Sequence, residues 1–259
     1  MLNNPLVIAS KEIVDHLRDA RSLLSSLMFA LMGPVVVGLV SLAPGIKGSA
    51  ESPIPAMMSV FTLVAAFSGG MNMAIDTIAG ERERRSLIPL LLNPVPRADI
   101  ALGKWLAVSL FALAGLLLNL LGSAVVFAMS GMRLHTSSAT FALAAVLAVL
   151  PLPLLAAAIQ LSLSTFCRAV KEAHTYLSML IFLPMGVGMS LVFFPAARKP
   201  SFAFLPLVGQ QLDLQRLMDG RDVPLLQSIV LGYLTLALAS ALVLLSSKRL
   251  HRDEIIYGN

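Results

Sequence analysis

Six long runs of apolar residues, separated by short polar segments, dominate the pattern of this chain. Each is about 20 residues or longer, the length that a helix needs to cross the roughly 30 Å apolar core of a bilayer. The alternating ten-residue segments of a membrane barrel do not occur. Because backbone groups in lipid must bond within their own segment, the runs predict transmembrane helices. The predicted spans are 23–43, 54–78, 104–130, 139–166, 174–197 and 224–247.

The residues before the first run predict an amphipathic helix at 5–22 that lies on the membrane surface. Ile13, Leu17 and Leu24 recur at helical spacing, while charged residues occupy much of the remaining surface. An apolar stripe of this kind suits the acyl boundary of a bilayer, and a short solvated leader is the alternative. The first run is longer than the roughly 7–15 apolar residues of a secretory leader, so we expect a retained span.

Composition agrees with an all-α integral membrane protein that forms a single domain over residues 1–259. Of the residues, 57% are hydrophobic and 13% are charged, and the mean hydropathy is +0.84, whereas soluble domains carry about 25% charged residues. The net charge of +5 does not indicate nucleic acid, because basic cytoplasmic flanks of spans produce the same excess. If the amino terminus is cytoplasmic, 13 of the 19 lysines and arginines fall on that side. Both termini are therefore predicted to be cytoplasmic.

A dense charged segment, residues 79–103, separates the second and third spans. Its charged part is followed by the apolar stretch 86–92 and by Pro94 and Pro96. The pattern predicts one short helix with a charged face and an apolar face, ended by the prolines. Such a segment either anchors the topology and does nothing else or is presented to a partner. The residues alone leave both open.

Few polar side chains lie within the spans. Polar groups at membrane depth often line a pathway, although hydrogen bonding between helices is the plainer interpretation. For the one carboxylate, Asp76, pairing with Arg82 or Arg85 is preferred over contact with a translocated cation. The four histidines share no ligand spacing, and no catalytic constellation falls inside a span, so neither a metal site nor a catalytic site is predicted. The candidate pathway residues are Asn72, Asp76, Asn119 and Gln160.

The charged segment resembles the signature of a transporter family. Residues 80–91, followed by Pro94-Val95-Pro96-Arg97 and Leu102-Gly103-Lys104, are similar to the segment that marks type-2 ATP-binding-cassette transporter permeases. The loop Lys171-Glu172-Ala173 is similar to that of the sodium-extrusion (NatB-like) branch. The resemblance covers most of the chain.

The resemblance implies a permease that binds no cofactor itself and works with a separate cytoplasmic ATPase, which would hold ATP and Mg. The chain has no Gly-x-x-x-x-Gly-Lys-Ser/Thr loop, in agreement. Two permease chains and two ATPase chains would form the working unit in the bacterial inner membrane, exporting sodium or a small toxic or organic solute. The residues implied to couple to the ATPase are Gly80, Glu81, Arg82, Glu83, Arg84, Arg85, Arg168, Lys171 and Glu172.

The resemblance further implies an external gate in segment 198–223, which contains Pro206, Gln210 and Gln211. A short helix there would dip into the outer leaflet and close the exit. Composition alone would allow an inert surface helix.

Two other classes of function are open from the residues. An ion-driven secondary transporter should show repeat symmetry and more ionisable groups at mid-membrane, where only Asp76 comes close. An intramembrane enzyme would need paired catalytic residues at membrane depth, and none occur in the sequence of the spans.

Overall fold

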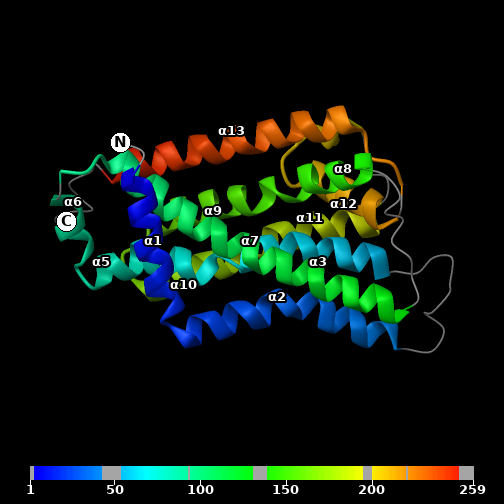
Figure 1. Cartoon of the computed structure of the whole chain (residues 1–259), viewed down its shortest axis with the longest axis horizontal. Helices are drawn as coiled ribbons and strands as arrows, with labels where there is room; N and C mark the ends of the chain where they lie inside the picture. Colours follow the sequence, from blue (N-terminus) through cyan, green and yellow to red (C-terminus); the bar gives the residue numbers. More distant parts are fainter. Residues whose placement is uncertain are drawn as a thin grey trace.

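The protein is an elongated bundle of helices (Figure 1). The computed structural model describes residues 3–42, 54–92, 94–130, 139–194, 200–219 and 221–250, and these residues contain no strand. Six helical stretches within them are long and apolar enough to cross a membrane. Helix α1 (Asn3–Leu17) lies across one end of the bundle, where the last helix, α13 (Leu225–Arg249), also finishes. We call this end the charged end and the opposite one the far end.

The six stretches follow the predicted spans, and several of them are built from more than one helix. The first is α2 (Ala20–Ser41), the third α7 (Arg97–Ser130) and the sixth α13. The second runs from Ile54 to Glu83 through α3 (Ile54–Ser68), α4 (Met71–Ala74), the π-helical turn η1 (Ile75–Gly80) and α5 (Glu81–Glu83). The fourth joins α8 (Ala139–Val149) to α9 (Pro151–Ser164), and the fifth joins α10 (Val170–Leu180) to α11 (Phe182–Phe193).

Several predicted boundaries at the charged end are wrong by a few residues. The second span continues to Glu83, the third begins at Arg97 and the fifth at Val170, because charged residues continue a helix past the apolar run wherever water or ion pairs satisfy them. The helix predicted at 5–22 ends at Leu17, since Asp19 caps the start of α2 by accepting a hydrogen bond from the Arg21 amide. The predicted ends at Ala43 and Ala197 lie outside the described residues.

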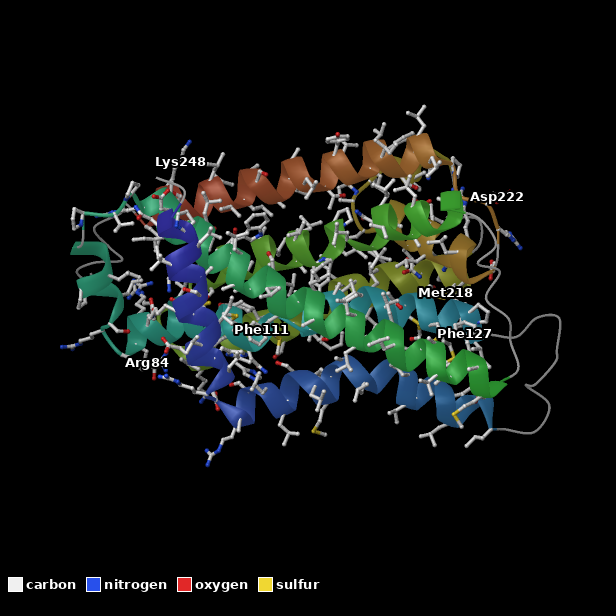
Figure 2. The ribbon with its side chains drawn as sticks, viewed as in Figure 1. Arg84, Phe111, Phe127, Met218, Asp222 and Lys248 are labelled. Atoms are coloured by element: carbon white, nitrogen blue, oxygen red, sulfur yellow. The ribbon has the colours of Figure 1, made fainter. Side chains whose placement is uncertain are left out.

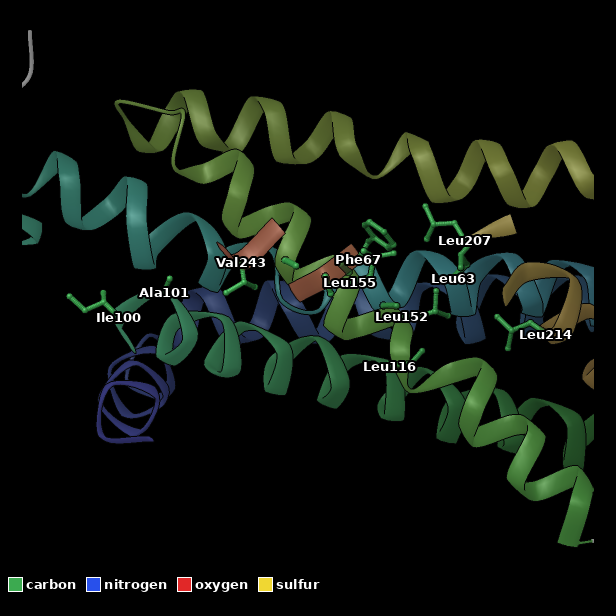
Figure 3. Packing of buried hydrophobic residues seen from close by; sticks show 14 of the residues in the cluster. Leu63, Phe67, Ile100, Ala101, Leu116, Leu152, Leu155, Leu207, Leu214 and Val243 are labelled. Carbon is green, nitrogen blue, oxygen red and sulfur yellow. The ribbon is translucent and has the colours of Figure 1, made fainter. Parts of the chain in front are cut away.

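The core joins four of the six spans. Leu63 and Phe67 of α3, Leu116 of α7, Leu152 and Leu155 of α9 and Val243 of α13 pack together in its centre (Figure 3). Between helices in lipid, close packing rather than water exclusion supplies the attraction.

Glycines bring the second and third spans into close contact. A Cβ atom on Gly70 would lie 2.8 Å from the Val108 carbonyl oxygen, and one on Gly115 would lie 2.8 Å from the Gly69 Cα atom. The glycine pair at 69–70 is also where α3 ends and α4 begins. The backbones therefore meet without intervening side chains, as small residues permit in membranes.

Candidate functional site

The charged segment is built differently from the single two-faced helix that its pattern predicts, and that prediction is wrong. Its charged residues continue the second span through η1 and α5, and its apolar residues form a separate helix, α6 (Leu87–Leu92). The turn between them contains Arg85 in a left-handed conformation, with a φ angle of 58°. Charged and apolar residues are consequently on two helices that can face different surroundings.

A cluster of four charged side chains, three of them buried, lies where this segment meets the helix bundle. The Lys104 side chain is fully buried, and its ammonium donates to Glu12 Oε1 at 2.9 Å, to Glu81 Oε2 at 2.8 Å and to the Thr77 carbonyl oxygen at 2.6 Å. Lys11, about half exposed, adds bonds to Glu81 at 3.1 Å and to Glu12 at 3.3 Å. Two ammonium groups thus neutralise two carboxylates. Buried charges need such oppositely charged partners to offset the cost of removing them from water. The cluster ties α1, the second span and α7 together.

The buried position of two members of this cluster was not evident from the sequence. Glu81 was predicted to couple to a partner, yet its side chain is only 8% exposed and points at Lys104 and Lys11. Lys104, the last residue of the motif Leu102-Gly103-Lys104, lies inside the protein. Gly80 beside them is buried as well, and a Cβ added there would lie 2.9 Å from Asp76 Oδ1. Charge alternates along residues 81–84, and this pattern gave no signal for which side chain turns inward.

The charged segment is bonded directly to the loop between the fourth and fifth spans. Glu83 Oε2 accepts a hydrogen bond of 2.6 Å from the Val170 amide, the first residue of α10, where a carboxylate also suits the helix dipole. Arg82 donates to the Cys167 carbonyl oxygen at 3.2 Å, and Glu172 accepts from the Arg168 amide at 2.8 Å. The two segments that the resemblance implied to be coupling elements therefore form one surface.

Exposed basic side chains cover this surface. Arg84 lies at the charged end (Figure 2), and its side chain is 63% exposed. Its guanidinium lies 3.7 Å from Asp76, so the partner of Asp76 is Arg84 rather than the predicted Arg82 or Arg85. The exposed basic residues here are Arg84, Arg85, Arg168 and Lys171.

A polar cavity of about 490 Å³ opens beside the buried cluster. Five carboxylates line it, together with Lys11, Arg84 and His16, so acidic charge outweighs basic charge. The carboxylates belong to Glu12, Asp15, Asp19, Asp76 and Glu81.

Among the cavity-lining groups outside the predicted spans, Lys11, His16 and Asp19 have shifted pKa values. Burial lowers the pKa of His16, whose ring stacks edge-on against Phe111 with 4.7 Å between centroids, although Asp76 and Asp19 oppose the shift. The Ser22 hydroxyl bond lowers the pKa of Asp19. Burial also lowers the pKa of Lys11, but Glu12 and Glu81 outweigh it and the net pKa is raised. His16 Nε2 is buried without a hydrogen-bond partner among the described residues.

The other candidate pathway residues bond to neighbouring helices. Asn72 Nδ2 donates to Ser25 Oγ at 2.7 Å, and Asn119 Nδ2 donates to the Ala30 carbonyl oxygen at 3.1 Å, both on α2. Gln160 Nε2 donates to the Phe67 carbonyl oxygen. These contacts hold helices together, as the plainer interpretation expected, and a pathway role for them stays a prediction.

At the far end, the predicted gate segment contains the short helices η3 (Pro200–Phe204) and α12 (Val208–Met218). Helix α12 does not lie on a surface: it inserts beside α3, α8 and α11. Gln210 donates to Thr235 Oγ1 at 2.6 Å and Gln211 donates to Ser59 Oγ at 2.9 Å, and both are fully buried. Pro206 lies half-buried before the helix. The sequence analysis expected a short helix in this segment but did not predict its buried position.

Sequence reasoning missed Asp213, the buried carboxylate of α12. It accepts a bond of 2.9 Å from Ser228 Oγ and lies 3.4 Å from Arg216, and burial raises its pKa. A carboxylate between Leu212 and Leu214 was a usable signal, because an acid flanked by large apolar residues is seldom buried without partners.

This arrangement matches a known family. A family model described as "ABC-2 family transporter protein" matches residues 6–254. The chain belongs to the ABC-2 transporter family.

Individual relatives of this ABC-2 protein agree. The chain is 32% identical to "ABC transporter permease protein NatB" of Bacillus subtilis over 186 residues. These aligned residues make up 69% of this chain and 48% of that protein. The chain is 35% identical over 102 residues to "Probable ABC transporter permease protein NosY" of Pseudomonas aeruginosa, covering 38% of this chain and 36% of that one. The matches thus span less than half the length of these curated relatives.

Proposed function

We propose that this chain is the membrane-spanning permease subunit of an ATP-driven exporter. A separate cytoplasmic ATPase, holding ATP and Mg, would bind the basic surface at the charged end, and a second permease chain would complete a homodimer in the bacterial inner membrane. The observation that carries the proposal is the bond between Glu83 and the Val170 amide, because it makes one continuous surface of two loops that family resemblance alone marks as coupling elements.

The predicted coupling residues would have two roles, and their different exposure supports this division. Arg84, Arg85, Arg168 and Lys171 are exposed and available to acidic groups of a partner. Glu81, with Lys104 and Glu12, would transmit a displacement of that surface to α1 and α7, because all three side chains are bonded within the protein. A push on the surface would then move several helices together, as domain-closure mechanisms require.

The cavity beside the cluster is the proposed entrance for the exported solute. Its excess of carboxylates favours a cation, and Asp76 is the pathway candidate that lies on its wall. Sodium, named for the sodium-extrusion branch, and a small organic cation both suit this charge. The buried helix α12, with Gln210 and Gln211, would close the exit at the far end.

The test is co-purification of the chain with its candidate ATPase. Charge reversal in Arg84→Glu/Lys171→Glu should reduce recovery of the ATPase at least tenfold, because each reversed residue repels the acidic groups it would otherwise attract. Arg221→Glu is the matched control, since Arg221 is an exposed arginine at the far end. Equal recovery in both variants contradicts the docking surface.

Reconstitution then addresses the exporter itself. Vesicles containing both proteins should expel sodium or an organic cation only with ATP, and the solute that stimulates ATP turnover identifies the cargo. Transport by the chain alone, driven by an ion gradient, would establish the secondary transporter instead.

A further inference from the structure

A second cavity at the charged end lies between α9 and α13 and has a different character. Its volume is about 430 Å³, and its wall is built mainly from leucine, isoleucine and phenylalanine side chains. Leu245 on this wall is 55% exposed, so the cavity opens on the outer surface of two predicted spans. In a membrane this surface meets lipid rather than water.

The hydroxyl groups in the wall are already satisfied. Ser162 Oγ and Ser246 Oγ are 2.9 Å apart, and Thr165 Oγ1 donates to the Ser162 carbonyl oxygen at 2.6 Å. Only Arg249 differs, because its Nη1 atom is buried without a hydrogen-bond partner among the described residues. The cavity therefore has a mainly apolar wall and, at one end, a buried guanidinium nitrogen of Arg249 that lacks a hydrogen-bond partner among the described residues.

The guanidinium group of Arg249 has a fixed orientation. Its guanidinium carbon lies 3.3 Å from the centre of the Phe166 ring, which fixes the plane of the group by cation–π contact. No described carboxylate lies within ion-pair distance of Arg249 or of its exposed neighbour Lys248, which Figure 2 shows pointing away from the bundle. An unpaired donor of this kind costs free energy unless an anion completes it.

We propose that this cavity binds one anionic phospholipid, with the phosphate on Arg249 and the upper part of an acyl chain along the wall. From Leu242 to Arg249 the helix rises about 10 Å, which gives the chain a groove that starts at the headgroup level. Basic pockets between membrane helices recognise anionic headgroups in this way, and a planar guanidinium binds phosphate through two parallel bonds. A free phosphate ion would gain nothing from the apolar wall, so the ligand is a lipid. The site is independent of the proposed export function.

Titration of the delipidated full-length chain with dioleoyl phosphatidylglycerol, followed by native mass spectrometry, tests the site. We expect one phosphatidylglycerol to bind at least tenfold more tightly than dioleoyl phosphatidylcholine, which has the same acyl chains and no net charge. Arg249→Gln should abolish this preference, whereas Lys248→Gln, the same charge change one residue away, should change it less than twofold. Equal losses in the two variants would mean general surface electrostatics and would overturn the proposal.

Two further variants separate headgroup from chain. Leu245→Trp fills the groove without changing charge and should weaken phosphatidylglycerol binding at least fivefold, and Arg249→Lys should retain part of the preference. An undiminished preference in Leu245→Trp, or displacement of the lipid by millimolar inorganic phosphate, would leave only an anion site and refute a lipid. Efficient cross-linking of two Leu245→Cys chains across this face would show that a second copy covers it, which also refutes the lipid.

Discussion

Lys104 shows how one side chain can join three parts of a membrane protein. Its ammonium group is fully buried and bonds to carboxylates that lie 92 and 23 residues away along the chain. An ion taken out of water costs several kcal/mol, and only good geometry with every bond satisfied recovers that cost. Here two carboxylates, a carbonyl oxygen and a second lysine meet the requirement.

Substituting Lys104→Gln should lower the free energy of unfolding by about 3–5 kcal/mol, because Glu12 and Glu81 would be left as buried charges with a single partner. Lys11→Gln should cost less than about 1 kcal/mol, since Lys11 is half exposed and its pairs are screened by water. Denaturant titration in mixed micelles, followed by the fluorescence of Trp105, measures both. Similar losses in the two variants would show that burial does not set the strength of these pairs.

His16 should make the charged end sensitive to acid. Burial lowers its pKa below the usual value of 6.5, so as the pH falls the unfolded chain takes up the proton before the folded protein does. Stability is then full above pH 6.5 and decreases below it, by at most about 1.4 kcal/mol for each pH unit. The melting temperature should fall between pH 7.5 and 5.5, and His16→Leu should reduce the fall. An unchanged pH profile in that variant would assign the effect to other groups.

At the scale of elements, the contact of α1 with α7 explains the run Leu102-Gly103-Lys104. Lys104 supplies the buried charge, and Gly103 supplies the space. A Cβ on Gly103 would lie 2.7 Å from the Pro5 carbonyl oxygen and 2.7 Å from Ile8 Cβ, so α1 lies against bare backbone here. The two residues serve the same contact from adjacent positions.

Gly103→Ala should therefore displace α1 and destabilise the protein by about 1–3 kcal/mol, as overpacking does. Gly186→Ala is the matched control, because Gly186 is also helical and nothing lies within 4 Å of its added Cβ. There the change should be neutral or stabilising by up to about 1 kcal/mol. Trypsin cleavage near Lys11 and Arg18 should accelerate in the first variant and not in the second.

At the scale of the whole molecule, the two ends differ in kind. The charged end carries the ion cluster, the acidic cavity and the basic surface, while α12 lies inside the far end with its amide side chains buried. This polarity suits a protein that receives force on one side and opens on the other. It also makes the orientation in the membrane a measurable quantity.

Cysteine labelling tests that orientation. In a Cys167→Ala background, Asp222→Cys should react with a membrane-impermeant maleimide on intact cells, and Lys171→Cys should react only after permeabilisation. Both positions are exposed. Asp222 lies at the far end (Figure 2), and Lys171 lies in the first turn of α10, which begins at the charged end (Figure 1). In the unsubstituted protein, Cys167 should label slowly under both conditions, since burial raises the pKa of its thiol. The opposite labelling pattern would place the charged end outside the cell.

The succession of apolar runs was enough to predict the helical class and six spans. The apolar core of a bilayer, about 30 Å thick, offers no hydrogen-bonding partners, so each backbone segment in it must form a helix. The length and hydropathy of each run are therefore enough to predict a helical span. The charged segment and the helix at 208–218 could be located in the same way, because their patterns are local. So could the preference of Asn72, Asn119 and Gln160 for bonds between helices.

Only the tertiary structure decided which charges are buried and which stay on the surface. Glu81 and Glu83 are two residues apart in one pattern, yet the first bonds to buried Lys104 and the second to the Val170 amide. Likewise α12 has the composition of a surface helix and is buried, because Ser59, Thr235 and Ser228 meet its polar groups from other helices. Hydropathy measures the preference of a side chain for water, whereas burial of a charge depends on partners that arrive from distant positions in the chain.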